Sequence, residues 1–202
     1  MTNRRDARTA DRILDAAERL VQTRGFNAFS YADVSKAVGI QKASLHHHFA
    51  TKTDLGLALV ARYRRGFLEA LRSIEAGSGE AVERLARYVE LYGSVLRQKR
   101  MCMCGMLAAD VATLPKAMRQ SVASFFAENE AWLARVLDEG KLRGEIRFDG
   151  SAVSMADFFV SSLEGAMLVA RGSGKLEHFD AVGRHLLAGV RGARARPRRR
   201  PG

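Results

Sequence analysis

Cysteine and proline are scarce in this chain, and their scarcity narrows the possible fold classes. The 202 residues include two cysteines, three prolines and one tryptophan. Two cysteines separated by a single residue do not form a disulfide framework and indicate a reducing compartment. Because prolines are few, alanines and leucines are many, and no clear alternating strand pattern is present, the sequence predicts an all-helical protein.

Long apolar runs and an apolar signal region are also missing. No window of eighteen apolar residues is present, so the sequence predicts no membrane span. The first residues are polar and charged, which favours the cytoplasm. The length of the chain is sufficient for a substantial core and one or two small domains.

Acidic residues are absent from the last twelve positions, where arginines accumulate. The formal net charge is +11, and it would be +5 without the arginines of this segment, Arg191, Arg194, Arg196, Arg198, Arg199 and Arg200. With two prolines and several small residues between the charges, the segment 191–202 is predicted to be a disordered tail. The tail either adds nonspecific phosphate contacts to DNA or is only a solvated end.

Residues 30–49 have the pattern of two short helices separated by a tight turn. Ser30 is a good N-cap, and Asp33 follows at the spacing of a capping box. Gly39 suits the left-handed turn that follows the first helix. After this turn, apolar residues recur at the spacing of a second helix that runs in a different direction, with polar residues between them. This arrangement is typical of a helix-turn-helix, whose second helix enters the major groove of DNA.

The flanking residues extend this pattern. Residues 10–24 form one amphipathic helix, which Gly25 ends. The sequence resembles the TetR family of transcriptional regulators, through ordered matches at Ile13-Leu14-Asp15-Ala16-Ala17, Arg24-Gly25-Phe26, Tyr31-Ala32-Asp33-Val34, Ala37-Val38-Gly39-Ile40, Ser44-Leu45, His48-Phe49 and Lys52-Thr53-Asp54-Leu55. The resemblance implies an N-terminal three-helix head (1–55), followed by a larger helical body (56–190) that binds an effector and dimerises.

The candidate DNA-binding residues lie in and around the second helix of the motif. We expect base contacts from Gln41, Lys42, Ser44 and His47, and phosphate contacts from Tyr31, His46 and Lys52, with Ser30 at the edge of the set. The family usually has a tyrosine at the position of His46. A histidine could replace this tyrosine as a donor, more strongly when protonated, so DNA binding would weaken at higher pH.

The body is predicted to be a series of helices over 52–75, 82–96, 104–114, 115–139, 151–171 and 176–190, with Gly140 and Gly144 ending the fourth. The last two resemble the family's dimer surface, and the two-fold dimer would match a palindromic operator. The alternative is that their broad apolar face completes the monomer core. The apolar and small residues of this face are Ala152, Met155, Phe158, Phe159, Ser162, Leu163, Gly165, Ala166 and Leu168.

Aromatic and sulfur-containing residues concentrate in the middle of the body. The resemblance implies a cavity there for a small hydrophobic molecule, although each such residue could equally be core packing. The candidate effector-binding residues are Tyr63, Phe67, Tyr88, Tyr92, Cys102, Met106, Phe126, Trp132, Met155 and Phe159.

The segment 101–110 resembles a branch of the family with a Cys-x-x-Gly-x-Leu-Ala-Ala-acid pattern, some of whose members sense electrophiles. Cys102 is the matching cysteine, and Lys99, Arg100 and a helix N-terminus are expected to lower its pKa. A soft-metal site at Cys102 and Cys104 is disfavoured, because helical residues two apart point in different directions. The remaining alternative is that both thiols are buried as small hydrophobes.

The sequence therefore predicts a ligand-responsive DNA-binding regulator, most simply a repressor, with double-stranded DNA, a second copy of the chain and a small effector as partners. No cofactor or metal is expected, because the adjacent histidines 46–48 diverge around the helix. A thiol-dependent enzyme using Cys102 is the first alternative, but no base, acid and oxyanion site stand at recognisable spacing. A nonspecific basic DNA-binding protein is the second, and it leaves the ordered helix-turn-helix unexplained.

Overall fold

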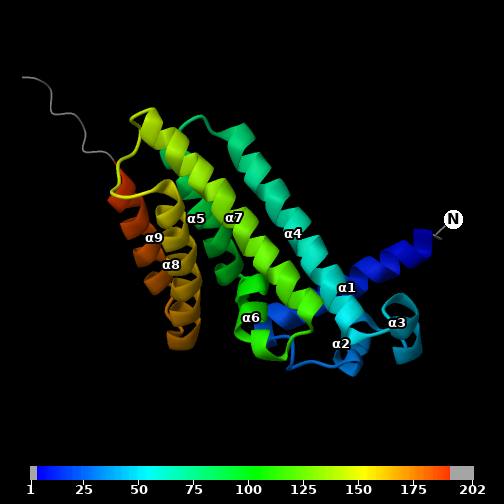
Figure 1. Ribbon diagram of the computed structural model, residues 1–202. Coiled ribbons are helices and arrows are strands. Elements are labelled where there is room, and N and C mark those ends of the chain that lie inside the picture. Colours follow the sequence, from blue (N-terminus) through cyan, green and yellow to red (C-terminus); the bar gives the residue numbers. More distant parts are fainter. Residues whose placement is uncertain (1–3, 192–202) are drawn as a thin grey trace, which may run out of the picture.

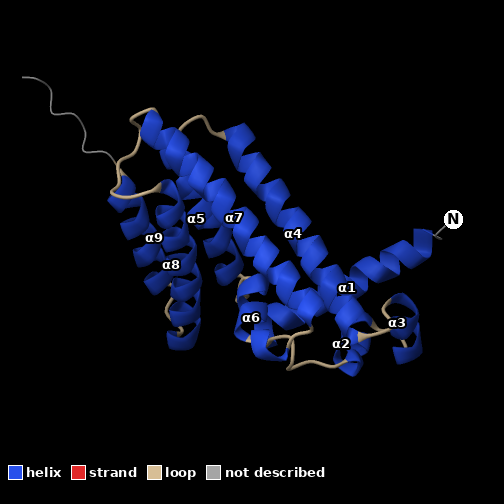
Figure 2. Ribbon diagram, in the orientation of Figure 1, coloured by secondary structure: helices blue, strands red, loops and turns tan. Residues whose placement is uncertain are grey.

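The computed structural model describes residues 4–191, which form helices joined by short connections (Figures 1 and 2). The head contains α1 (Arg4–Arg24), α2 (Tyr31–Val38) and α3 (Lys42–His48). The body contains α4 (Lys52–Gly77), α5 (Ala81–Arg97), α6 (Met103–Ala109), a short 3-10 helix η1 (Val111–Thr113), α7 (Lys116–Leu142), α8 (Ala152–Ser173) and α9 (Glu177–Val190). The predicted all-helical fold is confirmed. Figure 1 shows α2 and α3 at one end of the molecule, and α8 and α9 at the other.

Helix α2 begins and ends where its sequence signals predict. The Ser30 hydroxyl accepts a hydrogen bond from the Asp33 amide, and the Asp33 carboxylate accepts one from the Ser30 amide at 2.7 Å. Gly39 ends the helix with φ +73°, a left-handed conformation that glycine adopts without a steric penalty. The Arg12 guanidinium also donates to the Val38 carbonyl oxygen at 2.6 Å, which ties the end of α2 to α1.

Helix α4 runs without interruption across the boundary expected between residues 55 and 56. Thr51 and Asp54 form a second capping box at its start. The same helix packs against α1 of the head and against α5, α6 and α7 of the body. Any movement of α4 is therefore transmitted directly to the head.

Two of the predicted helix ends are wrong because tertiary contacts decide them. The helix expected over 104–114 ends at Ala109, and Asp110 turns towards the head, where its carboxylate accepts a hydrogen bond from the Phe26 amide at 2.9 Å. Gly140 lies inside α7, where a side chain would overlap with Ala81. The helix ends at Leu142, and Gly144 with φ +72° makes the turn.

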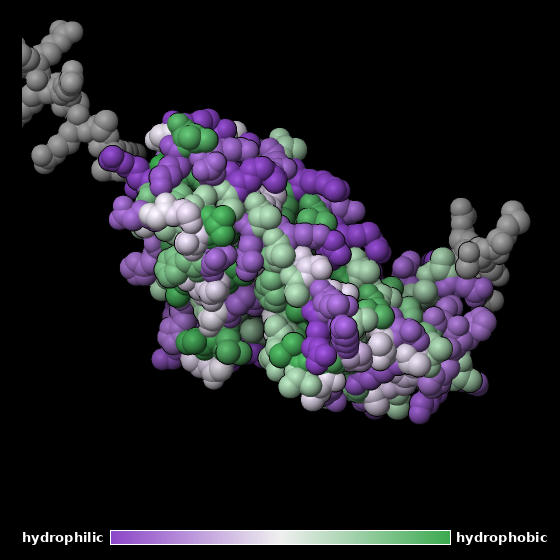
Figure 3. Space-filling model, viewed as in Figure 1, coloured by the Kyte–Doolittle hydropathy of each residue, from purple (hydrophilic) through white to green (hydrophobic). Residues whose placement is uncertain are grey.

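The apolar face predicted for α8 divides into a buried part and an exposed part. Phe159, Leu163 and Ala166 are buried in the monomer, so the alternative of core packing is correct for them. Phe158 and Leu168 remain 57% and 64% exposed, with Val153 and Val169 also exposed on this helix. Figure 3 shows hydrophobic side chains along this side of the body.

The expectation of no membrane-spanning segment is too strong for α8. Over an 18-residue window this helix has a mean hydropathy of 1.4, and 33% of the window is buried. By length and composition alone it could cross a membrane, although it packs here against α7 and α9. The predicted disordered tail lies outside the described residues, except for Arg191, which forms a bridge with Ile146.

Candidate DNA-binding surface and effector pocket

Helix α3 presents a polar surface at the tip of the head. Gln41, Lys42, His46 and His47 are exposed there, Ser44 is half-buried, and Leu45 anchors the helix from below. Exposed donors on the second helix of a helix-turn-helix have the placement required for reading base edges in the major groove. The structure therefore brings the predicted base-contacting residues to one surface.

Two of the predicted phosphate contacts are engaged inside the head. The Tyr31 hydroxyl donates to the Phe49 carbonyl oxygen at 2.9 Å, and burial raises the pKa of Tyr31 to about 12. The Lys52 ammonium donates to the Phe29 carbonyl oxygen at 2.6 Å and lies above the rings of Phe26 and Phe29. Partial burial lowers the pKa of Lys52. Both residues brace the helix-turn-helix in this structure, and their contact with DNA stays a prediction.

His46 is exposed beside Tyr31, with 4.7 Å between the ring centroids. Its Nδ1 lies 3.1 Å from the Ala50 carbonyl oxygen. When Nδ1 carries a proton and donates to this oxygen, Nε2 of the neutral ring can only accept a hydrogen bond. His46 could then donate to a DNA phosphate only after gaining a second proton.

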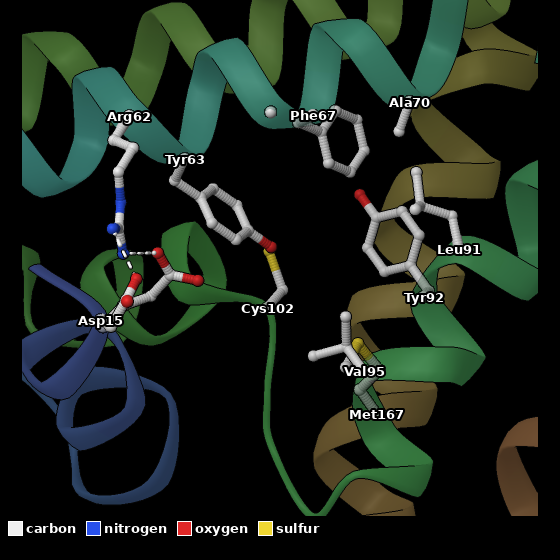
Figure 4. Close-up of a pocket in the computed structure, with 12 residues that line it drawn as sticks. Asp15, Arg62, Tyr63, Phe67, Ala70, Leu91, Tyr92, Val95, Cys102 and Met167 are labelled. Atoms are coloured by element: carbon white, nitrogen blue, oxygen red, sulfur yellow. Dashed lines mark hydrogen bonds and ion pairs between the residues drawn. The ribbon is translucent and has the colours of Figure 1, made fainter. Parts of the chain in front are cut away.

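A cavity of about 390 Å³ opens between the head and the body. Its walls come from α1, α4, α5 and α8, and Cys102 lines it with the sulfur beside the Tyr63 hydroxyl (Figure 4). Most of the lining is apolar or aromatic, with polar groups at the rim and beside the sulfur. The lining residues are Asp15, Glu18, Arg62, Tyr63, Gly66, Phe67, Ala70, Leu91, Tyr92, Val95, Cys102 and Met167. Such a lining suits a small, largely apolar ligand with one or two polar atoms.

At the rim of the pocket, one arginine joins the head to the body. The Arg62 guanidinium from α4 donates to Asp15 and to Glu18 of α1, both at 2.7 Å. Arg62 and Glu18 are largely buried, whereas Asp15 is 71% exposed. Charge-assisted bonds of this kind are stronger when partly buried. A ligand in the pocket therefore touches the link between α1 and α4 directly.

Further contacts fasten the end of α1 to the body. The Arg171 guanidinium of α8 donates to the Gln22 carbonyl oxygen at 2.9 Å and also to that of Thr23. The Met101 amide donates to the same Gln22 oxygen at 3.1 Å, and the Arg100 side chain reaches the Gln22 amide oxygen at 3.2 Å. The head is thus attached to the body at the end of α1 as well as through Arg62.

The structure brings four of the ten predicted effector residues together. Tyr63, Phe67, Tyr92 and Cys102 line the pocket. Tyr88 and Trp132 are buried and stack on one another, and Asn129 bridges the hydroxyls of Tyr88 and Tyr92 with hydrogen bonds of 2.8 Å. The others lie elsewhere: Met106 packs near Gly25, Phe126 packs beside Phe125, and Met155 and Phe159 line a separate groove between α8 and α9.

The expected low pKa of Cys102 is wrong. Its sulfur does accept hydrogen bonds from the Gly105 amide at 3.5 Å and from the Tyr63 hydroxyl at 3.7 Å. However, burial and the nearby Glu164 carboxyl raise the pKa of the thiol well above its ordinary value. Arg100 directs its charge towards glutamine side chains instead of the sulfur. Cys104 is also buried, and burial raises the pKa of its thiol.

Sequence reasoning missed the charged rim and one acid, Glu164, whose Oε1 atom is buried. Asp15 and Glu18 stand three residues apart on an amphipathic helix, a spacing that usually marks a solvated face. Glu164 interrupts an apolar helix, and this interruption was a usable signal, because a charged residue is seldom buried without a role. Arg62 offered no local signal, since its partners are more than forty residues away.

The comparisons with known proteins agree with this arrangement. Residues 13–59 match the family described as "Bacterial regulatory proteins, tetR family", and residues 81–186 match the "Tetracyclin repressor-like, C-terminal domain". A TetR-family regulator from Agrobacterium tumefaciens superimposes with a TM-score of 0.90 at 33% identity, covering 93% of this chain and 100% of that one. The transcriptional repressor NemR of Escherichia coli K12 is 24% identical over 185 residues, 88% of this chain and 92% of the relative. The repressor DhaR of a Mycobacterium strain, GP1, is 24% identical over 84% of this chain and 87% of that protein.

The head and the pocket together define a ligand-responsive, DNA-binding transcriptional regulator with a helix-turn-helix. The chain belongs to the TetR family, because the two family matches together span most of the sequence. The matched family and the relatives are regulators, not enzymes, and the nonspecific DNA-binding alternative is not favoured. The family and function predicted from the sequence are confirmed at this level.

Proposed function

We propose that the protein is a cytoplasmic repressor that binds a palindromic operator as a dimer and is released when a small effector enters the pocket at Arg62. The observation that carries the proposal is the composition of this pocket. Asp15 and Glu18 of the head and Arg62 of the body all line one cavity. An effector that fills it and favours one arrangement of these groups shifts the head relative to the body.

The second copy of the chain would cover the exposed side of α8 and α9. Phe158 and Leu168 are large, apolar and more than half exposed on α8. An apolar groove of about 220 Å³ between α8 and α9 includes Phe158 in its lining, together with Val182 and Leu186. A two-fold pairing of this surface would place two heads side by side, which the two half-sites of a palindrome require.

Release would follow from a change in the separation of the two heads. Consecutive half-sites are spaced by about 34 Å or a multiple of it, so a small tilt of each α4 reduces the match to DNA. The arginine-rich tail, of which only Arg191 is described, would add phosphate contacts that carry no sequence information.

The effector itself would be small, mostly apolar, and either bound reversibly or attached to Cys102. Aromatic side chains of α4 and α5 face the cavity, and the buried Cys102 is among the residues that line it. A reactive electrophile of this size could reach the sulfur through the pocket. The family resemblance of the Cys102 segment supports the covalent alternative.

The first test is a gel-shift titration with the DNA upstream of the protein's own gene, using scrambled DNA as competitor. We expect tight binding that scrambled DNA does not displace. Lys42→Ala should weaken this binding by about tenfold, because one good base contact is worth about 1–3 kcal/mol. Lys175→Ala removes the same charge from an exposed position after α8 and serves as the matched control.

Equal loss of affinity in the two variants would contradict base reading by α3. Equal binding to specific and scrambled DNA across all salt concentrations would contradict a sequence-specific repressor. Circular dichroism of Lys42→Ala should match the parent protein, because the Lys42 side chain is exposed.

A further inference from the structure

A half-buried glutamate with one fully buried oxygen stands beside the Cys102 thiol. Glu164 belongs to α8, and its Oε1 atom is fully buried without a hydrogen-bond partner. Gly105 leaves the space that this carboxyl occupies, because a side chain at Gly105 would overlap with Glu164 Oε2. The spacing Cys-x-x-Gly therefore places the thiol and the gap for the carboxyl on the same turn of α6.

Two hydrogen-bond donors reach the Cys102 sulfur. The sulfur accepts hydrogen bonds from the Tyr63 hydroxyl and from the Gly105 amide. Both of these groups are donors, so neither accepts the S–H proton in this arrangement. The Glu164 carboxyl packs against Gly105, whose amide bonds the sulfur, and it interacts electrostatically with the thiol, so it is the proton acceptor beside the sulfur.

We propose that Glu164 is the proton acceptor that activates Cys102 towards electrophiles entering the effector pocket. The inference rests on the proposed function for the route by which the electrophile arrives. It adds a second residue, from a different helix, to the chemistry of the thiol. It also accounts for the buried, unpartnered Oε1 atom of Glu164 on α8.

The reaction balances with the groups present. With an α,β-unsaturated carbonyl compound, the Cys102 sulfur bonds to the β-carbon, and the electron pair of the C=C bond takes up a proton at the α-carbon. Glu164 accepts the thiol proton as the S–C bond forms and then gives a proton back to the adduct, directly or through water. Tyr63 and Gly105 stabilise the negative charge on sulfur while its proton leaves.

The surroundings of Glu164 set the pH range in which it can accept the thiol proton. Burial raises the pKa of Glu164 to about 7, whereas the pKa of the Cys102 thiol is well above its ordinary value. The titratable groups that face the carboxyl are Tyr63 of α4, Tyr88 and Tyr92 of α5, and Cys102 and Cys104 of α6. Above neutral pH the carboxyl is ionised while the thiol still holds its proton. The carboxylate can then remove the thiol proton during the attack, so the reaction does not depend on a thiolate formed beforehand, which burial disfavours.

The test measures alkylation of the full chain by iodoacetamide, using intact-protein mass spectrometry between pH 6 and 9. In this reaction the sulfur bonds to the methylene carbon, iodide leaves, and Glu164 passes the thiol proton to water. A Cys104→Ala background limits labelling to one thiol, and Cys102→Ser should take up no label. We expect the rate to rise through about pH 7 in the parent. Glu164→Gln should remove this rise and slow labelling at pH 7.5 by about tenfold or more.

The sign of the effect separates this proposal from its simplest competitor. If the Glu164 charge only suppresses the thiolate, Glu164→Gln would accelerate labelling at every pH, and that result would overturn the proposal. Unchanged rates would overturn it as well. Glu130→Gln is the matched control, because Glu130 lies on α7, and burial and Asp157 raise its pKa. Glu164→Asp withdraws the carboxyl by one methylene and should give an intermediate rate.

Failure of the proposed function has a different signature. If labelling depends on Glu164 but the labelled protein still binds operator DNA as tightly as before, the thiol chemistry stands and the release mechanism fails. If an apolar ligand releases DNA while labelling is independent of Glu164, the release mechanism stands and the role of Glu164 fails.

Discussion

The head and the body use their polar residues in opposite ways. In the head, the cap of α2 is satisfied by neighbours three residues away, Ser30 and Asp33, and the donors of α3 remain exposed. In the body, the polar groups beside the pocket are buried and paired across helices, as where Asn129 joins Tyr88 to Tyr92. The DNA-facing surface is thus specified by local sequence, whereas the effector-facing surface is specified by packing between distant segments.

The contrast explains how one part can respond to the other. A head stabilised by its own caps keeps its shape when it moves. A body whose polar groups are paired between helices has contacts that a ligand can rearrange. Arg62 belongs to both systems, because it comes from a body helix and binds two acids of α1.

The largest expected effect comes from separating the two copies of the body. Phe158→Glu places a charge on the exposed apolar side of α8, where a partner would bury it. We expect a monomer by analytical ultracentrifugation. Affinity for a two-half-site operator should fall by about 100-fold or more, because the second head no longer adds its binding. The head should remain folded, since its core lies at the other end of the molecule (Figure 1).

Leu142→Glu is the matched control for that experiment. Leu142 is 80% exposed and apolar, but it stands at the end of α7 and outside the proposed contact surface. A dimer of unchanged stability is expected there. If Leu142→Glu dissociates the dimer and Phe158→Glu does not, the contact surface on α8 is wrong.

The next largest effect is expected where the two regions meet. Arg62→Ala removes the link to Asp15 and Glu18 and leaves Glu18 partly buried without its cation. In the parent, we expect Cys102 alkylation to raise the operator Kd by about fivefold or more. In Arg62→Ala, the ratio of the Kd after alkylation to the Kd before it should fall towards one. Unfolding free energy should also drop by about 1 kcal/mol. Fluorescence anisotropy and thermal unfolding measure the two quantities.

Arg64→Ala gives the comparison on the same helix. Arg64 pairs with Glu128 of α7 and so connects two body helices rather than the body and the head. Its removal should leave the Kd ratio intact. A ratio that falls equally in the two variants would show that α4 is merely destabilised and that Arg62 has no special part in coupling.

The sequence predicted features that depend on local residues better than features that depend on contacts between distant segments. The ends of α2 were predictable because Ser30, Asp33 and Gly39 act within one or two turns. The end of α6 was not, because Asp110 leaves the helix to accept a hydrogen bond from Phe26, 84 residues away in sequence. Gly140 likewise served close packing against Ala81 instead of helix termination.

The pocket was predictable in kind but not in its polar groups. Aromatic residues such as Tyr63 and Phe67 marked the region correctly, since their spacing places them on one face of α4. The sequence predicted a lowered pKa for Cys102, whereas the structure raises it. Helix ends and nearby cations can be seen in a sequence, but the removal of water from a buried thiol cannot. The pKa of a buried thiol depends on which side chains surround it, and Glu164 lies on another helix.

The smallest effect should come from a cap of the head, and its consequences sharpen the comparison. Ser30→Ala removes the capping hydroxyl of α2 and should lower the unfolding free energy by about 1 kcal/mol. Ser151→Ala removes the equivalent hydroxyl of α8 in the body and should have a similar effect on stability. Only Ser30→Ala should also weaken operator binding, because α2 positions α3.

The capping box of α2 is also expected to depend on pH. Hydrogen bonds from Ser30 lower the pKa of Asp33 below its ordinary value of 3.8. The stabilisation of the folded state by the ionised Asp33 is therefore complete above pH 3.8 and is lost as the pH falls through the lower pKa of the folded protein. The stability difference between Ser30→Ala and the parent should therefore shrink in acid, whereas that of Ser151→Ala, whose cap involves no carboxylate, should not.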